Sequence, residues 1–261
     1  MALIEKESSC DCGMPQLKIS KESFDKLAYD TQEMTLQTKN TCANQPITTP
    51  TVLIIFAGAD LNAAAYHLSK SLEAPFEANA VVTVLVQESV QTEFIAIAQN
   101  NLKAYTNEVP QHPGFVAALQ TIEKLNAKTI NANGVERNQS PTIVLDFTHE
   151  QLSAVGPTGI VTLHTFRTAK EAIALCAKET VNFKNASLWH ENHSCAYELV
   201  AALKCGNYFI NCNLVPLDVL KDHIKAGRSY VAIDNSYHYE TLPISGIQKS
   251  VVFPIGTIFA N

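Results

Sequence analysis

The fold is decided by the stretch Glu77-Ala78-Asn79-Ala80-Val81-Val82-Thr83-Val84-Leu85-Val86-Gln87-Glu88-Ser89. Its centre, residues 81–87, is an apolar run of the kind found in strands that are buried on both faces. A second such run, Val52-Leu53-Ile54-Ile55-Phe56, precedes it. Between the two, residues 61–72 carry apolar positions at helical spacing behind Asp60, a good N-cap residue. Two buried strands joined by a helix predict parallel pairing in an α/β sheet.

The same alternation continues along the chain. Helices are predicted at 93–105, from Pro113 onward, at 170–180, and from Asn192 or Ser194 to Lys204, where Cys205-Gly206 ends the helix. Strands are predicted at 142–145, 161–166 and 208–211. Repeated β and α units of this kind predict an α/β sandwich with right-handed crossovers.

Composition narrows the classes of function. The chain has 261 residues, of which 46% are hydrophobic and 17% charged, so one large domain with a full core is expected. A net charge of −6 gives no support for nucleic-acid binding, which favours a basic face. No stretch approaches the roughly 20 apolar residues of a membrane span. Seven cysteines without a framework spacing favour reduced thiols, and the polar start does not resemble a signal peptide, so we expect a cytoplasmic protein.

Residues 1–50 differ from the rest and are predicted to form an arm and linker beside a domain at 51–261. Within the arm, residues 18–38 carry a weak apolar stripe that fits one amphipathic helix. Cys10-Asp11-Cys12 could be half of a metal site, but no matching Cys or His pair lies nearby, so a chain terminus without a metal is the preferred interpretation.

Seven blocks resemble the aldehyde dehydrogenase superfamily, in the order and spacing of its C-terminal, catalytic-domain half. The blocks are Leu53-Ile54-Ile55-Phe56 with Asp60-Leu61, residues 84–89, Gly156-Pro157 with residues 161–166, residues 171–175, residues 185–189, residues 206–211 and residues 249–252. The resemblance implies a three-layer αβα sandwich like the catalytic domain of that family.

The resemblance also locates a site that has lost its reacting groups. Ala78 stands where the family carries its nucleophilic cysteine, and a methyl group cannot attack a carbonyl carbon. Pro46 occupies the position of the general base, and Ser153 that of the glutamate that binds the coenzyme ribose. No part of this sequence matches the family's coenzyme-binding domain. We therefore expect no catalysis and no cofactor.

Four further groups of residues are candidates for a catalytic, metal-binding, phosphate-binding or partner-binding role. Cys212 follows the Asn211 match and is the best candidate for a replacement thiol, whereas Cys176, Cys195 and Cys205 are expected to pack at helices. His190-Glu191-Asn192-His193 is one residue short of the zinc-binding His-Glu-x-x-His spacing, so a polar loop is predicted. Gly156-Pro157-Thr158-Gly159 lacks the pattern of a phosphate loop. His238 with Tyr230, Tyr237 and Tyr239 fits either partner contact or local packing.

The segment Lys249-Ser250-Val251-Val252-Phe253-Pro254-Ile255 is predicted to be a terminal edge strand, because proline suits an edge. In the family the matching strand joins the oligomerisation sheet of a partner subunit. The resemblance therefore implies a homo-oligomer or larger assembly, with interface residues Val251, Val252, Phe253 and Ile255.

The preferred hypothesis is a catalytically inactive aldehyde dehydrogenase homologue that serves as a structural, scaffolding or assembly subunit. The alternatives are a regulatory half-subunit of an active NAD(P)-dependent aldehyde dehydrogenase, or a residual thiol esterase. A vestigial pocket that binds a small molecule is a further possibility.

Overall fold

The structure is a computed structural model that describes residues 49–106, 108–152 and 158–256. The chain divides into two units, residues 1–47 and 48–261, and all described residues belong to the second. The predicted helix at 18–38, the Cys10 and Cys12 pair, Pro46 and Ser153 lie outside the described residues. The predicted boundary at residue 50 therefore stays a prediction.

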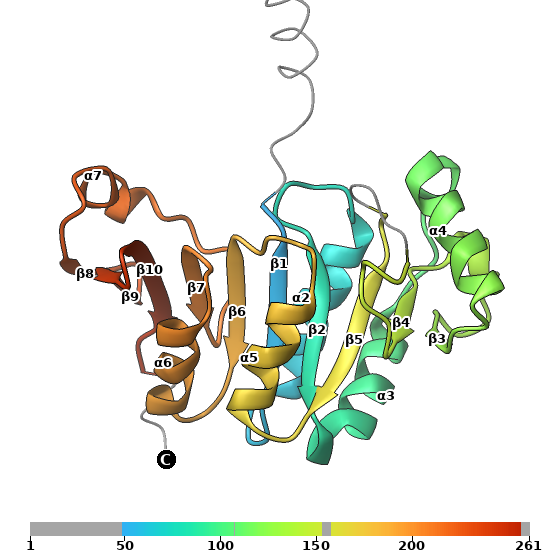
Figure 1. The fold of residues 1–261 in the computed structure, drawn as a ribbon, viewed down its shortest axis with the longest axis horizontal. Coiled ribbons are helices and arrows are strands. Elements are labelled where there is room, and N and C mark those ends of the chain that lie inside the picture. Colours follow the sequence, from blue (N-terminus) through green and yellow to red (C-terminus); the bar gives the residue numbers. More distant parts are fainter. Residues whose placement is uncertain (1–48, 107, 153–157, 257–261) are drawn as a thin grey trace, which may run out of the picture. The chain divides into compact units, whose positions relative to one another are not determined.

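The described residues build one ten-stranded sheet in the order β3-β4-β5-β2-β1-β6-β7-β10-β9-β8 (Figure 1). The strands from β4 to β10 in this order run parallel, and the pairs β3/β4, β10/β9 and β9/β8 are antiparallel. Parallel pairing of the first two strands is confirmed. The strands are β1 (Thr51–Ile55), β2 (Val81–Gln87), β3 (Thr129–Ile130), β4 (Ile143–Leu145), β5 (Val161–Phe166), β6 (Asn185–Trp189), β7 (Asn207–Ile210), β8 (Tyr230–Asp234), β9 (Tyr237–Ile244) and β10 (Ile247–Pro254).

Helices cover both faces of this sheet. Leu53 and Ile55 of β1 pack in a core cluster with α2 and α3, whereas Val52 and Ile54 pack in a second cluster with α5 and α6. The three-layer αβα sandwich is thus confirmed. The helices are α2 (Leu61–Glu73), α3 (Gln91–Asn101), α4 (Pro113–Lys124), α5 (Ala169–Lys178), α6 (His193–Ala202) and α7 (Lys221–Lys225), with 3-10 turns η1 (Glu88–Val90), η2 (Val109–Gln111), η3 (Arg137–Gln139) and η4 (Asp218–Leu220).

Local signals in the sequence fix the helix starts. The Asp60 carboxylate accepts from Ala63 N at 3.0 Å and caps α2, as predicted. For α6 the sequence predicted either Asn192 or Ser194 as the N-cap residue. Asn192 is the cap, because its Oδ1 accepts from Ser194 N at 2.9 Å. These bonds satisfy N–H groups that have no partner within the helix.

The C-terminal segment is not an edge strand, so that prediction is wrong. β10 pairs with β7 over residues 250–252 and with β9 along its whole length. Its Val251 and Val252 are fully buried in the chain's own core. The reason is that residues 230–244 form two further strands, which extend the sheet past β10. Pro254 lies beyond the last pair with β7, where its missing N–H is not needed.

Lys249 ties β10 to the helix that lies above it. The residue is 1% exposed, and its ammonium donates to three carbonyl oxygens at the end of α6, those of Val200 at 2.5 Å, Leu203 at 2.7 Å and Ala201 at 3.3 Å. Carbonyl groups at a helix C-terminus lack intrahelical partners and carry partial negative charge, so a cation is stabilising there. Burial lowers the pKa of Lys249. The three carbonyl oxygens remain the hydrogen-bond acceptors of its side-chain nitrogen.

We expect Lys249→Met to lower the free energy of unfolding by about 2 kcal/mol, because three hydrogen bonds from a charged donor are lost and, of the three carbonyl groups, that of Leu203 keeps the Tyr208 hydroxyl as a donor. Urea unfolding followed by circular dichroism measures the change. Lys204→Met, at an exposed lysine beside the same helix end, is the matched control and should change stability by less than about 0.5 kcal/mol. Equal effects of the two variants would contradict the capping role.

Candidate functional site

Ala78, which the sequence resemblance aligns with a nucleophile position, lies where the parallel strands begin, here called the amino edge. Ala78 sits in the turn between α2 and β2, where it is half-buried. Its carbonyl oxygen accepts from Thr49 N at 2.6 Å and from Thr49 Oγ1 at 3.1 Å. Its side chain is a methyl group, so this residue can neither attack a substrate nor move a proton.

Asparagine side chains connect the strands at this edge. Asn185 Nδ2 donates to Thr49 O at 3.1 Å and to Asn79 Oδ1 at 3.3 Å. Asn207 Nδ2 in turn donates to Asn185 Oδ1 at 2.9 Å, and the Thr49 hydroxyl contacts Asn79 Oδ1. The network joins β1, β2, β6 and β7 through neutral groups, none of which titrates. It can hold the edge in shape, but it offers no acid or base.

Sequence reasoning missed Asn185 and Asn207 as members of the site. A signal was present, since each is a polar residue at the first position of a buried strand. In a parallel sheet such first positions meet at one edge, so two asparagines there can reach each other.

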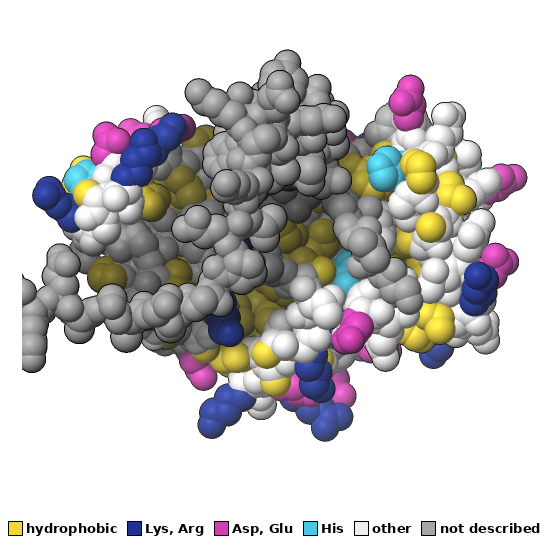
Figure 2. Space-filling model, turned by 45° about the horizontal axis from the view of Figure 1, so that its top comes forward, with side chains coloured by type: hydrophobic (Ala, Val, Ile, Leu, Met, Phe, Trp, Pro, Cys, Tyr) yellow, Lys and Arg dark blue, Asp and Glu magenta, His cyan; other side chains and the backbone are white. Residues whose placement is uncertain are grey.

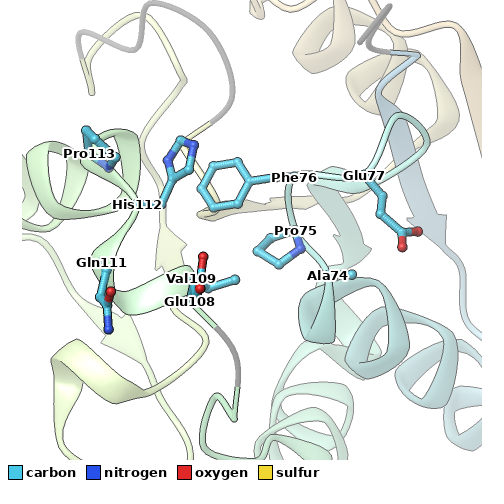
Figure 3. A pocket seen from close by; sticks show the side chains of 9 residues that line it. All are labelled: Ala74, Pro75, Phe76, Glu77, Glu108, Val109, Gln111, His112 and Pro113. Carbon is cyan, nitrogen blue, oxygen red and sulfur yellow. The ribbon is translucent and has the colours of Figure 1, made fainter. Parts of the chain in front are cut away.

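A cavity of 730 Å³ opens beside this turn (Figure 3). Figure 3 shows the rings of Phe76 and His112 facing each other, and their centroids lie 3.7 Å apart at an interplanar angle of 29°. Glu77 and Glu108 supply its two carboxylates, and Glu77 extends away from the stacked pair. Figure 2 turns the amino edge toward the reader and shows hydrophobic side chains in the middle of this face, with charged ones mostly toward its rim.

Gly159 is required by the same cavity wall. It has a φ of +71°, and a Cβ atom at this position would lie 2.9 Å from Phe76 Cζ. Only glycine therefore fits beneath the Phe76 ring. Gly156 and Pro157 of the same predicted segment lie outside the described residues, so the prediction that it is not a phosphate loop stays a prediction.

A buried polar cluster lies between β5, β2 and the end of α5. His164 Nε2 donates to Glu179 Oε1 at 3.2 Å, and His149 N donates to Glu179 Oε2 at 3.0 Å. His149 Nε2 donates to Val82 O at 2.9 Å. Burial alone would raise the pKa of Glu179, but the hydrogen bonds from His164 and His149 bring it below its ordinary value. Burial lowers the pKa of His149.

Cys212 lies on the opposite edge of the sheet from Ala78. Ala78 precedes β2, whereas Cys212 follows β7, and the four residues of that strand span roughly 13 Å at 3.3 Å per residue. The thiol is 6% exposed, and its Sγ donates to Val252 O at 3.6 Å. Burial raises the pKa of Cys212 to about 12. A buried thiol of this kind is not poised as a thiolate nucleophile.

The other cysteines have the predicted places at helices. Cys176 lies in α5, Cys195 in α6, and Cys205 is buried shortly after α6. Cys176 and Cys205 line a second cavity, of 320 Å³, and burial raises the pKa of each to about 12. Neither is poised as a thiolate nucleophile.

The remaining candidate residues pack locally. His190 Nδ1 accepts from Asn192 N at 2.8 Å, and His193 begins α6. Across the described ranges, no three His, Cys, Asp or Glu side chains gather as a metal site requires. His238 stacks on Phe253 with ring centroids 4.3 Å apart, and Tyr230 stacks on His223 at 3.6 Å.

A sequence family described as "Protein of unknown function (DUF1487)" matches residues 47–259. Among curated proteins, none matches the chain. Every helix in the described part of the chain is too short or too polar to cross a membrane.

Solved aldehyde dehydrogenases share the fold. An NAD-dependent aldehyde dehydrogenase from Sinorhizobium meliloti matches 65% of this chain and 38% of its own, at 20% identity and a TM-score of 0.52. Lactaldehyde dehydrogenase from Escherichia coli matches 65% and 40%, at 18% identity and a TM-score of 0.51. Indole-3-acetaldehyde dehydrogenase AldA of P. syringae matches 79% and 46%, at 17% identity and a TM-score of 0.51. The chain thus spans less than half the length of each enzyme.

The cluster of His149 and Glu179 predicts loss of stability in acid. A histidine whose folded pKa lies below its ordinary value of 6.5 resists protonation in the folded state, so stability falls as pH drops below about 6.5. Glu179, with a folded pKa below 4.5, adds stability above that value and loses it as pH falls through its folded pKa. We expect the thermal midpoint, measured by calorimetry, to fall from pH 7 to pH 5 and again below pH 4.5.

Two variants separate these windows. His149→Gln should flatten the upper part of the curve and leave the lower part, whereas Glu179→Gln should flatten the lower part. A curve that neither variant changes would show that this cluster does not control the acid response.

Proposed function

The chain belongs to the family described as "Protein of unknown function (DUF1487)", and we propose that it is a catalytically inactive aldehyde dehydrogenase homologue with a structural or assembly role. The proposal rests on the chemical groups that surround Ala78 at the amino edge. At the position that the resemblance gives to the family nucleophile, Thr49 donates hydrogen bonds to the Ala78 carbonyl oxygen, and the network that joins the strands there consists of neutral hydroxyl and amide groups.

The resemblance supports inactivity at further positions. Pro46 stands at the family's general-base position, and Ser153 at that of its ribose ligand. Covalent aldehyde oxidation needs a nucleophile, a base and a positioned coenzyme at one point in space. Cys212, the best substitute thiol, is buried at the opposite sheet edge.

The structural half of the proposal is supported by what the fold retains. The two large core clusters are continuous on both faces of the sheet, and the polar groups at the amino edge satisfy one another. A site without reacting groups inside such a frame favours a role that depends on shape, in a protein assembly.

We expect the purified chain to show no aldehyde-dependent reduction of NAD+ or NADP+ and no hydrolysis of p-nitrophenyl acetate above background. Ala78→Cys should be equally inactive in aldehyde oxidation, because one thiol does not restore the base or the coenzyme site. Absorbance at the NAD(P)H and nitrophenolate wavelengths measures both reactions.

A wild-type chain that oxidises aldehydes would overturn the proposal. Ester hydrolysis that Cys212→Ser abolishes would instead establish the thiol esterase. A Cys205→Ser variant, at another thiol whose pKa burial raises to about 12, is the matched control for that substitution.

The second candidate is a regulatory half-subunit of an active NAD(P)-dependent aldehyde dehydrogenase. It is favoured by the extent of the match, since the chain corresponds to 38–46% of the solved dehydrogenases. A regulatory half-subunit should elute with a full-length enzyme from a sizing column and change its kcat or KM. Separate elution from the dehydrogenases of its own source, with unchanged kinetics, would exclude it.

A further inference from the structure

Strand β8 ends the sheet and presents an unpaired backbone edge (Figure 1). It pairs with β9 from Tyr230↔Thr241 to Asp234↔Tyr237. Among the strands of the described residues, none pairs with its other side. The N–H and C=O groups of such an edge form a template for another strand.

Two large aliphatic side chains stand exposed on this strand. Val231 is 58% exposed and Ile233 is 72% exposed. Because they are two residues apart, they point to the same face of the sheet. The opposite face is covered, since Ala232 packs against the cluster of Tyr239 and Leu220. Proteins usually protect an edge with lysine, proline or a bulge, but the apolar face of β8 carries none of these.

We propose that β8 pairs antiparallel with β8 of a second copy of this chain, about a twofold axis at Ala232. This inference rests on the proposed assembly role and names its partner. The axis places Val231 opposite Ile233 of the second copy, and Ile233 opposite Val231. Two pairs of β-branched side chains then cover one another on one face, and cross-strand pairs of this type stabilise sheets.

The sequence of the strand selects this register. Shifting the axis by half a residue toward the C-terminus would place Val231 opposite the Asp234 carboxylate. In the central register Asp234 lies opposite Tyr230 of the second copy, two residues from that copy's Arg228. Both charged residues are exposed, so this arrangement brings opposite charges together at each end of the joined strands.

A twofold axis also explains why a second copy fits better than an unrelated peptide. An isologous interface uses one patch on both subunits, so the patch must complement itself. Residues 228–234 do so, with Val231 opposite Ile233 in apolar contact and Asp234 near Arg228 in charge. Pairing over one short strand buries less than a standard interface, so the dimer should be weak and dependent on concentration.

Sedimentation velocity over a micromolar to submillimolar range tests the proposal with the full chain. We expect wild type to shift from monomer to dimer, and Ile233→Lys to weaken dimerisation at least about tenfold, because it removes two apolar pairs and adds like charges. Val116→Lys, at an exposed aliphatic residue of α4, is the control and should dimerise as wild type does. Circular dichroism confirms that each variant folds.

Disulfide trapping tests the register. Opposed residues of an antiparallel pair have Cα atoms about 4.5–5.5 Å apart, within reach of a disulfide. Ala232→Cys, on the axis, should form a covalent dimer under mild oxidation beyond the wild-type background. Asp234→Cys, which lies opposite Tyr230, should not.

A wild-type chain that stays monomeric over this range would overturn the proposal. So would a dimer that Ile233→Lys leaves unchanged, because another surface would then carry it. Either result leaves the inactive, structural role standing, whereas aldehyde oxidation by wild type would remove that role without affecting the dimer measurement. A monomer whose β8 binds a different protein would replace the second copy as occupant.

Discussion

The buried ammonium of Lys249 is the interaction on which the C-terminal half of the sheet depends. It holds three carbonyl groups at the end of α6 while its own strand, β10, pairs with β7 and β9. A lysine is stable at 1% exposure only where such acceptors surround it. The segment that resembles the family's oligomerisation strand thus pairs with β7 and β9 of its own chain, and the sheet ends on this side at β8.

At the amino edge of the sheet, the side-chain network consists of neutral groups. At the amino edge, Asn185 receives and donates hydrogen bonds that span four strands. A thiolate would need a cation or a helix N-terminus to lower its pKa, and an amide cluster supplies neither. The network therefore stabilises this end of the strands through groups that do not titrate.

The parts of the fold that were predictable depend on local signals. Residues 81–87 and 52–56 are apolar enough to require burial on both faces, and Asp60 marks a helix start by its own chemistry. Residues 230–244 escaped prediction because nearly all of their apolar side chains are exposed or half-exposed, so only pairing with β10 shows them to be strands. The first positions of Asn185 and Asn207 in their strands place both at the same end of a parallel sheet, but the sequence does not show that β6 and β7 are neighbours, and the hydrogen bond between the two side chains depends on that. Cys212 follows β7 whereas Ala78 precedes β2, so the two residues lie at opposite ends of the parallel strands.

The core does not depend on the residues at the strand ends, because it is built from the faces of the strands and the helices that cover them. Because β10 lies within the sheet, β8 is the end strand on this side, and no other strand of the described residues pairs with its outer backbone. Val231 and Ile233 would impose a continuing risk of aggregation there unless some surface covers them. Pairing of β8 with β8 of a second copy would cover both side chains without requiring a different protein, which favours the proposed dimer.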